Sequence, residues 1–256
     1  MKACILAGGF GTRLSEETDR LPKPMVEIGH RPMLWHVMRT LANGGISDFY
    51  VAGGYRQDRI KSWVEAYPRS SGDLRVDFSQ GTIETANSDT EAWTITVADT
   101  GLETATGGRL LRLRPYLDDN TFLLTYGDGV ANVDLAALLA THRSGSYLAT
   151  VTAVLPPARF GALTIEGDRI VDFAEKAPFR ESYINGGYMV FEPAIFDRIS
   201  GDETVLEADV LTQLAQEGKL GAHIHRGFWM PMDTLRDKRV LERLWETGER
   251  PWLSTG

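Results

Sequence analysis

Short apolar runs alternate along the first 155 residues with segments in which apolar side chains recur every three or four positions. The short runs are typical of buried strands, and the longer spacing is typical of helices that cover a sheet. The alternation therefore predicts an α/β fold with a mixed, mostly parallel sheet. The expected strands are 2–7, 49–52, 93–97, 122–126 and 147–155. The expected helices are 32–43, a segment around 60–64, 107–117 and a segment that Asp134 caps.

The pattern changes at two places. Residues 69–106 are rich in Ser, Thr, Gly and Asp, and we expect loops and one half-exposed strand there. Beyond Pro156 the pattern favours strands over 162–165, 169–173 and 188–191, with a hairpin turn at Gly167 and Asp168. Helices are expected near 193–199, 207–216 and 234–246. No linker or internal repeat divides the sequence, so a single domain over residues 1–256 is expected.

Composition narrows the possible functions. The 256 residues carry a formal net charge of −8, which argues against a general nucleic-acid surface because such a surface needs clustered basic charge. The only cysteine, Cys4, lies in an apolar run and is expected to be a buried thiol. No apolar stretch approaches a signal peptide or a membrane span, so the sequence predicts a cytoplasmic protein.

A glycine-rich turn directly follows the first predicted strand. Gly8, Gly9 and Gly11 would let the backbone approach a phosphate closely, and Arg13 would add a permanently charged donor. A tight turn without a ligand explains the glycines equally well. The third glycine of a dinucleotide-binding fingerprint is missing, which argues against a dehydrogenase.

Two further segments carry residues suited to phosphate chemistry. Lys23 stands between Pro22 and Pro24, which favour an extended path and would position its ammonium, although a lysine in a loop is usually solvated. Asp128 stands between two glycines after a predicted buried strand, where Mg²⁺ could use it as a ligand. A turn aspartate is the more common explanation of that pattern alone.

The motifs taken together resemble those of the sugar nucleotidylyltransferases, and within them the glucose-1-phosphate cytidylyltransferase branch. The resemblance extends from residue 3 to about residue 238. Its motifs are LAGGFGTRL, PKPM, WH at 35–36, VADTG, TGGRL, TYGDG, PPARFGAL, EK at 175–176, INGGYMVF and GFWMPMDTLRDK. Uridylyl and thymidylyl relatives usually carry a Gln-Pro-x-Gly stretch, which this sequence lacks.

This resemblance implies the fold, the reaction and the partners. We expect a Rossmann-like sheet flanked by helices, with residues 1–155 mainly binding nucleotide and 156–256 mainly binding sugar phosphate and forming the closing helices. The implied reaction joins CTP to glucose 1-phosphate, giving CDP-glucose and pyrophosphate, with Mg²⁺ as cofactor. The resemblance also implies a homo-oligomer. The acidic charge balance and the lack of a long apolar stretch predict no nucleic-acid or membrane partner, and the length predicts a single catalytic activity.

The resemblance assigns roles to individual positions. The expected catalytic residues are Arg13, Lys23 and Asp128. The expected nucleotide-binding residues are Leu6, Ala7, Gly8, Gly9, Gly11, Thr12, Arg13, Lys23, Thr106, Gly107, Gly108, Arg109 and Gly127. The expected sugar-phosphate-binding residues are Glu175, Lys176, Asn185, Gly187 and Trp229. Asp128 and Asp233 are the expected metal ligands.

Three alternatives remain open from the sequence. The first is a nucleotidylyltransferase that uses UTP, dTTP or another sugar 1-phosphate. The second is a non-catalytic relative that binds nucleotide sugars, against which the joint presence of Arg13, Lys23, Asp128, Lys176 and Asp233 argues. The third is a dinucleotide-dependent oxidoreductase, which the incomplete glycine fingerprint disfavours.

Overall fold

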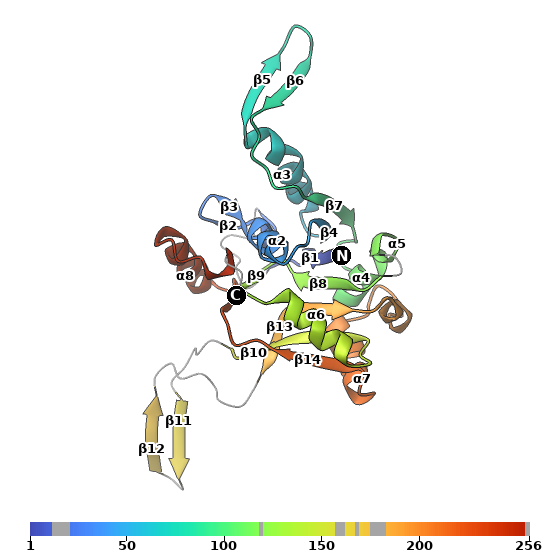
Figure 1. The fold of residues 1–256 in the computed structure, drawn as a ribbon, viewed down its shortest axis with the longest axis vertical. Helices are drawn as coiled ribbons and strands as arrows, with labels where there is room; N and C mark the ends of the chain where they lie inside the picture. Colours follow the sequence, from blue (N-terminus) through green and yellow to red (C-terminus); the bar gives the residue numbers. More distant parts are fainter. Residues whose placement is uncertain (12–20, 118–119, 157–161, 167–168, 175–182, 254–256) are drawn as a thin grey trace.

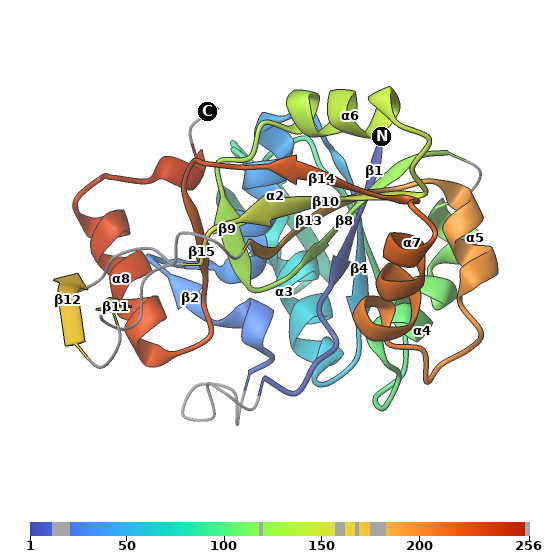
Figure 2. The ribbon, with the colours of Figure 1, turned by 90° about the horizontal axis from the view of Figure 1, so that it is seen from below.

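The fold centres on one seven-stranded sheet with helices on both faces (Figures 1 and 2). The computed structural model describes residues 1–11, 21–117, 120–156, 162–166, 169–174 and 183–253. Four of the expected site residues therefore lie outside the described residues: Thr12, Arg13, Glu175 and Lys176.

The sheet is mixed but mostly parallel, as the sequence predicts. The strands lie in the order β14 (Leu220–Ile224), β10 (Ala149–Val154), β13 (Ile184–Phe191), β8 (Phe122–Tyr126), β1 (Lys2–Leu6), β4 (Asp48–Gly53) and β7 (Thr94–Asp99). All neighbouring pairs are parallel except the two that β13 makes with β8 and β10. The carboxyl ends of β1, β4 and β8 consequently lie at the same edge, where ligands of open α/β sheets bind.

Two apolar clusters cover the two faces of this sheet. Alternate residues of β1 point to opposite faces, so Ile5 packs in one cluster while Cys4 and Leu6 pack in the other. Cys4 is fully buried, as expected, and burial raises the pKa of its thiol. The helices are α2 (Met33–Asn43), α3 (Gln57–Ser70), α4 (Thr106–Arg112), α5 (Arg114–Leu117), α6 (Leu135–Ser144), α7 (Thr212–Gln216) and α8 (Leu235–Glu246). No helix in the described part of the chain is long and apolar enough to cross a bilayer.

Short elements complete the fold. The single-turn and irregular helices are η2 (Lys23–Met25), η3 (Pro193–Arg198), the π-helix η4 (Leu206–Leu211) and η5 (Pro251–Leu253). Small antiparallel pairs are formed by β2 (Glu27–Ile28) with β3 (Arg31–Pro32), β9 (Gly129–Ala131) with β15 (Trp229–Pro231), and β11 (Ala162–Glu166) with β12 (Arg169–Ala174). The antiparallel β11–β12 pair confirms the two strands expected there, while the turn expected at Gly167 and Asp168 lies outside the described residues.

The structure corrects two expectations. The polar segment 69–106 contains a hairpin of β5 (Asp73–Asp77) and β6 (Thr82–Ala86), which projects from the body beyond α3 (Figure 1). The helix expected over 107–117 is instead divided at Leu113 into α4 and α5. Pro115 explains the break, because it has no amide hydrogen to donate to the Leu111 carbonyl and so interrupts the helical ladder.

A buried histidine ties the C-terminal segment to α2. The Trp252 indole donates to Nδ1 of His36 at 3.2 Å, so Nε2 carries the imidazole hydrogen and donates to the Ile28 carbonyl at 2.9 Å. The His36 side chain is completely buried. Desolvation lowers the pKa of His36 from 6.5 to about 4, against the opposing effect of its backbone hydrogen bonds. The neutral imidazole is therefore the form that the fold stabilises.

Acid should destabilise the protein through this histidine. Between pH 6.5 and about 4 the unfolded chain binds a proton at His36 that the folded protein does not bind, so stability falls as the pH falls through that window. We expect the His36 contribution to the free energy of unfolding to drop by about 2 kcal/mol from pH 7 to pH 5. Urea unfolding of the wild type and of His36→Gln at both pH values measures it. Equal pH dependence in the two proteins would contradict this assignment.

Candidate active site

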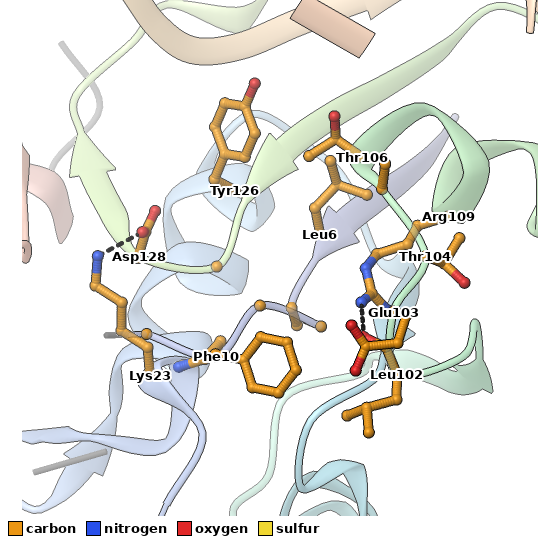
Figure 3. Close-up of a pocket in the computed structure, with 17 residues that line it drawn as sticks. Leu6, Phe10, Lys23, Leu102, Glu103, Thr104, Thr106, Arg109, Tyr126 and Asp128 are labelled. Carbon is orange, nitrogen blue, oxygen red and sulfur yellow. Dashed lines mark hydrogen bonds and ion pairs between the residues drawn. The ribbon is translucent and has the colours of Figure 1, made fainter. Parts of the chain in front are cut away.

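A cavity of about 440 Å³ opens at the carboxyl ends of β1 and β8 (Figure 3). Three segments supply its walls: the glycine-rich turn after β1, the end of β8, and the loop that leads into α4. Its lining includes most of the described residues that the sequence assigned to the nucleotide. These are Leu6, Ala7, Gly8, Gly9, Gly11, Lys23, Thr106, Arg109 and Gly127, together with Asp128.

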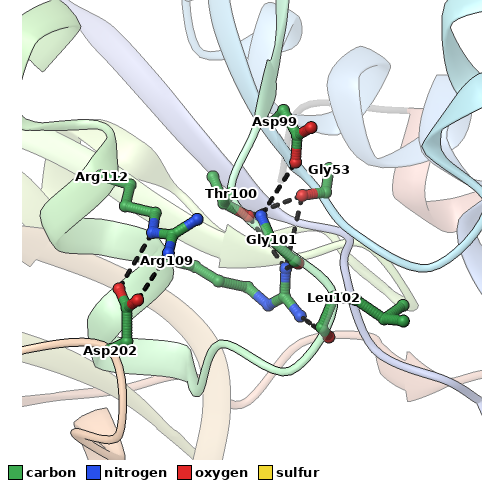
Figure 4. A network of polar contacts seen from close by, with 8 residues as sticks. All are labelled: Gly53, Asp99, Thr100, Gly101, Leu102, Arg109, Arg112 and Asp202. Atoms are coloured by element: carbon green, nitrogen blue, oxygen red, sulfur yellow. Dashed lines mark hydrogen bonds and ion pairs between the residues drawn. The ribbon is translucent and has the colours of Figure 1, made fainter.

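Arg109 lies beneath the glycine turn and is 5% exposed. Its Nη1 donates to Gly101 O at 2.7 Å, Thr100 Oγ1 at 2.9 Å and Gly53 O at 3.3 Å, and its Nη2 donates to Leu102 O at 2.9 Å (Figure 4). Burial lowers the pKa of this guanidinium. These contacts fix the loop that forms one wall of the cavity, and a contact between Arg109 and the base or ribose stays a prediction.

Packing explains several of the glycines. A Cβ on Gly8 would lie 2.2 Å from Arg109 Nη1, and Cβ atoms on Gly107 and Gly108 would lie 2.7 Å from Thr204 O and 2.4 Å from Asp202 O. The amides of Gly107 and Gly108 donate to Thr204 O at 2.9 and 3.3 Å. Both glycines thus let α4 approach residues 202–204 closely, behind the cavity that Thr106 and Arg109 line. Their predicted contacts with a ligand remain predictions.

Lys23 lies in a single 3₁₀ turn rather than in the extended path that the flanking prolines favour. The Met25 amide donates to Pro22 O at 2.8 Å and the Val26 amide to Lys23 O at 3.1 Å, which close the turn. The lysine is buried, so the solvated loop lysine considered as an alternative is ruled out. Its ammonium donates to Asp128 Oδ2 at 2.7 Å and to Asp233 Oδ1 at 2.6 Å.

The β9–β15 pair brings these two carboxylates together. Asp128 immediately precedes β9 and Asp233 follows β15, and the Met232 amide donates to Asp128 O at 2.7 Å. Thr234 begins α8 with a capping box, in which the Asp237 carboxylate accepts from the Thr234 amide and, at 3.2 Å, from the Asp233 amide. The Asp128 and Asp233 side chains are 32% and 16% exposed, so both are partly shielded from water, and Asp128 lines the cavity.

A second, smaller cavity of about 50 Å³ adjoins the first. It is lined by Thr125, Tyr126, Asp128, Gly129, Asn185, Gly186, Gly187, Trp229 and Pro231, which include the three described residues assigned to the sugar. The Trp229 indole donates to Gly186 O at 2.7 Å, and Asn185 Oδ1 accepts from the Gly187 amide at 2.9 Å. Tyr126 and Asp128 line both cavities, so they stand where the two meet.

Sequence reasoning missed Glu207, which contacts two residues that line the larger cavity. Its carboxylate accepts hydrogen bonds from the Tyr126 hydroxyl and, at 2.7 Å, from Thr106 Oγ1. Burial, followed by the charge of Glu207 and this hydrogen bond, raises the pKa of Tyr126. Glu207 lies 81 and 101 positions from these partners, and no local pattern points to such contacts.

Comparison with known proteins identifies the family. The family model described as "Nucleotidyl transferase" matches residues 2–237. The glucose-1-phosphate cytidylyltransferase of Salmonella typhi is 47% identical over 98% of both chains, and a protein of Bacillus subtilis named "Probable glucose-1-phosphate cytidylyltransferase" is 39% identical over 98% of this chain and 99% of its own. The crystal structure of HddC from Yersinia pseudotuberculosis shares the fold, with a TM-score of 0.67 and 21% identity over 95% of this chain and 99% of that one. The chain belongs to the nucleotidyl transferase family.

Proposed function

We propose that the protein is a glucose-1-phosphate cytidylyltransferase, which converts CTP and α-D-glucose 1-phosphate into CDP-glucose and pyrophosphate. The observation that carries the proposal is the Lys23 ammonium between Asp128 and Asp233, where the two cavities meet. The extensive identity to the Salmonella typhi enzyme supports these two substrates in particular. A cytoplasmic location agrees with the single buried cysteine.

The reaction needs no general base from the protein. A phosphate monoester has a second pKa of about 6, so glucose 1-phosphate is mostly dianionic at neutral pH and its oxygen can attack directly. That oxygen forms a bond to the α-phosphorus of CTP while the bond from the α-phosphorus to the bridging oxygen breaks and pyrophosphate leaves. The task of the protein is to bring two polyanions into line and offset their charge.

Lys23 is suited to this task because its ammonium lies on the wall of the larger cavity. It would contact the α-phosphate and the incoming sugar phosphate, while Arg13, which lies outside the described residues, would contact the departing phosphates. Gly9 and Gly11 would bring backbone amides close to the triphosphate. Asn185, Gly187 and Trp229 line the smaller cavity and would contact the sugar together with Glu175 and Lys176.

Asp128 and Asp233 fit a Mg²⁺ site. Mg²⁺ binds proteins through one or two carboxylates and takes its other ligands from water and phosphates, and these two carboxylates converge on one point. Two carboxylates against one ammonium leave the cluster with an excess of one negative charge, which would repel a triphosphate. A divalent cation reverses that sign and, when bound, offsets the charge that develops on the leaving pyrophosphate.

A panel of CTP, UTP, dTTP and GTP with glucose 1-phosphate tests the proposed substrate. Cytosine and uracil present opposite donors and acceptors, so a site built for one leaves buried groups unpaired with the other. We expect kcat/KM for CTP to exceed that for UTP by about a hundredfold or more. Pyrophosphate release and chromatography of the nucleotide sugar measure it. Preference for another triphosphate, or no pyrophosphate with any of the four, would disprove the proposal.

Substitutions at the charged cluster test the metal site. Asp128→Asn and Asp233→Asn should each lower kcat/KM by about a hundredfold and weaken Mn²⁺ binding in the presence of CTP, because each removes a charged ligand. Electron paramagnetic resonance reports the bound Mn²⁺ without relying on turnover. The exposed Asp197, which lies 3.4 Å from Arg114, supplies the control Asp197→Asn, which should match the wild type. If either aspartate variant kept its activity within about tenfold of the wild type, a change of only ~1.4 kcal/mol in the activation barrier, the metal assignment would be refuted.

We also propose that the protein forms homo-oligomers through the projecting β5–β6 hairpin. Leu74, Val76 and Ile83 lie on one face of this ribbon and are each at least 39% exposed, and Phe78 at its tip is 93% exposed. A two-stranded ribbon with an exposed apolar face has little stability by itself, and a second copy would cover that face.

Light scattering on the purified protein tests this interface. The wild type should have a mass at least twice that of one chain, and Ile83→Lys should lower it because a charge then enters the apolar contact. Glu84→Lys is the matched control, since Glu84 lies on the opposite face beside Arg75. A monomeric wild type, or equal effects of the two variants, would count against the hairpin.

A further inference from the structure

The Glu207 carboxylate lies outside both cavities and accepts hydrogen bonds from residues in their walls. Glu207 lies in η4 and is not among the described residues that line either cavity. Its two oxygens accept from the hydroxyls of Tyr126 and Thr106, which extend from the end of β8 and the start of α4. Figure 3 shows both hydroxyls on the side of the cavity away from Lys23 and the glycine turn.

Tyr126 is held from two directions. Gly187 has φ +83°, and a Cβ there would lie 2.7 Å from Tyr126 Cδ2, so the ring rests directly against β13. The hydroxyl at the other end of the ring is fixed by Glu207. Because Tyr126 lines both cavities, its position determines the shape of each at the point where they meet.

Thr106 is fixed by the same segment. Its hydroxyl accepts from the Leu206 amide at 2.9 Å and donates to Glu207 at 2.7 Å, so the first residue of α4 is bonded twice to η4. A π-helical turn is rare and often occurs at functional sites, where it displaces one side chain from regular helical spacing. Here that turn directs the Glu207 carboxylate toward the back of both walls.

We propose that Glu207 is a positioning residue that couples the two substrate cavities through Tyr126 and Thr106. The inference rests on the proposed function, in which CTP binds in the larger cavity and the sugar of glucose 1-phosphate contacts residues that line the smaller one. Without this carboxylate, the Tyr126 ring and the Thr106 hydroxyl lose their shared acceptor, and both walls lose their fixed geometry. Glu207 itself contacts neither substrate, so its loss affects binding of both more than the chemical step.

Steady-state kinetics with each substrate varied in turn tests the proposal. Glu207→Ala should raise the KM for CTP and the KM for glucose 1-phosphate each by about tenfold, with kcat within about threefold, because hydrogen bonds to a charged acceptor are lost. Glu207→Gln keeps the shape and one carbonyl acceptor, so it should restore part of both KM values. Tyr126→Phe should raise the same two KM values. The double variant that combines it with Glu207→Ala should have KM values within about threefold of those of the poorer single variant.

Asp209→Asn provides the matched control. Asp209 lies in the same π-helical turn, and its carboxylate accepts from the Val205 amide at 2.7 Å, whereas the hydroxyls of Tyr126 and Thr106 donate to Glu207. Asp209→Asn should leave both KM values within about threefold of wild type, even where it lowers the melting temperature. If Glu207→Ala fails to fold, Glu207→Gln and Tyr126→Phe carry the same comparison.

Three outcomes would overturn the coupling: a change in only one of the two KM values, additive effects in the double variant, or an equal loss in Asp209→Asn. The wild type is measured first with the panel of triphosphates. If it uses a triphosphate other than CTP, the proposed function fails while the Glu207 comparison proceeds with the substrate that the wild type uses. If the wild type turns over none of them, both proposals fail together.

Discussion

The ion pairs of Lys23 join segments that are far apart in sequence at the edge of the sheet where the candidate active site lies. Burying an ammonium costs several kcal/mol unless its charge is matched, and the matching carboxylates lie 105 and 210 positions away. Three parts of the chain must therefore meet: the 3₁₀ turn after the first strand, the end of β8, and the start of α8. The capping box of α8 fixes the backbone of Asp233, and the β9–β15 pair fixes that of Asp128. The capping box and the β9–β15 pair therefore position both carboxylates.

The sequence predicts the fold best where the signal is local. Strands such as β1 and β8 are continuous apolar runs, and α6 begins with Asp134 accepting from the Ala137 amide, as its capping pattern indicates. The β5–β6 hairpin escapes sequence-based prediction because it has few apolar residues in a strongly polar stretch, and these are exposed in the described part of the chain. The break between α4 and α5 follows from Pro115, a signal that was present in the sequence but outweighed by the periodic leucines.

In the candidate site, too, local sequence signals are predictive and contacts between distant segments are not. Glycine and proline neighbours single out Lys23 and Asp128 as unusual, because they restrict or free the backbone locally. They do not reveal that Lys23 folds into a turn and pairs with both aspartates, since that pairing depends on segments far apart in sequence. Arg109 shows that a motif also does not reveal which protein groups its side chain contacts. Its motif suggests a ligand contact, which stays a prediction, and the structure shows that its Nη1 and Nη2 atoms donate to three backbone carbonyls and one hydroxyl.

Packing within the chain explains some of the glycines near the candidate site but not all of them. Gly8 accommodates Arg109, Gly107 and Gly108 accommodate residues 202–204, and Gly187 accommodates the Tyr126 ring. A Cβ on Gly9 would meet no atom of the described residues within 4 Å, although Gly9 lines the larger cavity. Packing against the described residues therefore gives no reason for glycine at that position, whereas the proposed approach of a phosphate to the backbone would give one. Gly9 is thus the described glycine of the turn whose predicted ligand contact has no competing explanation from packing among the described residues.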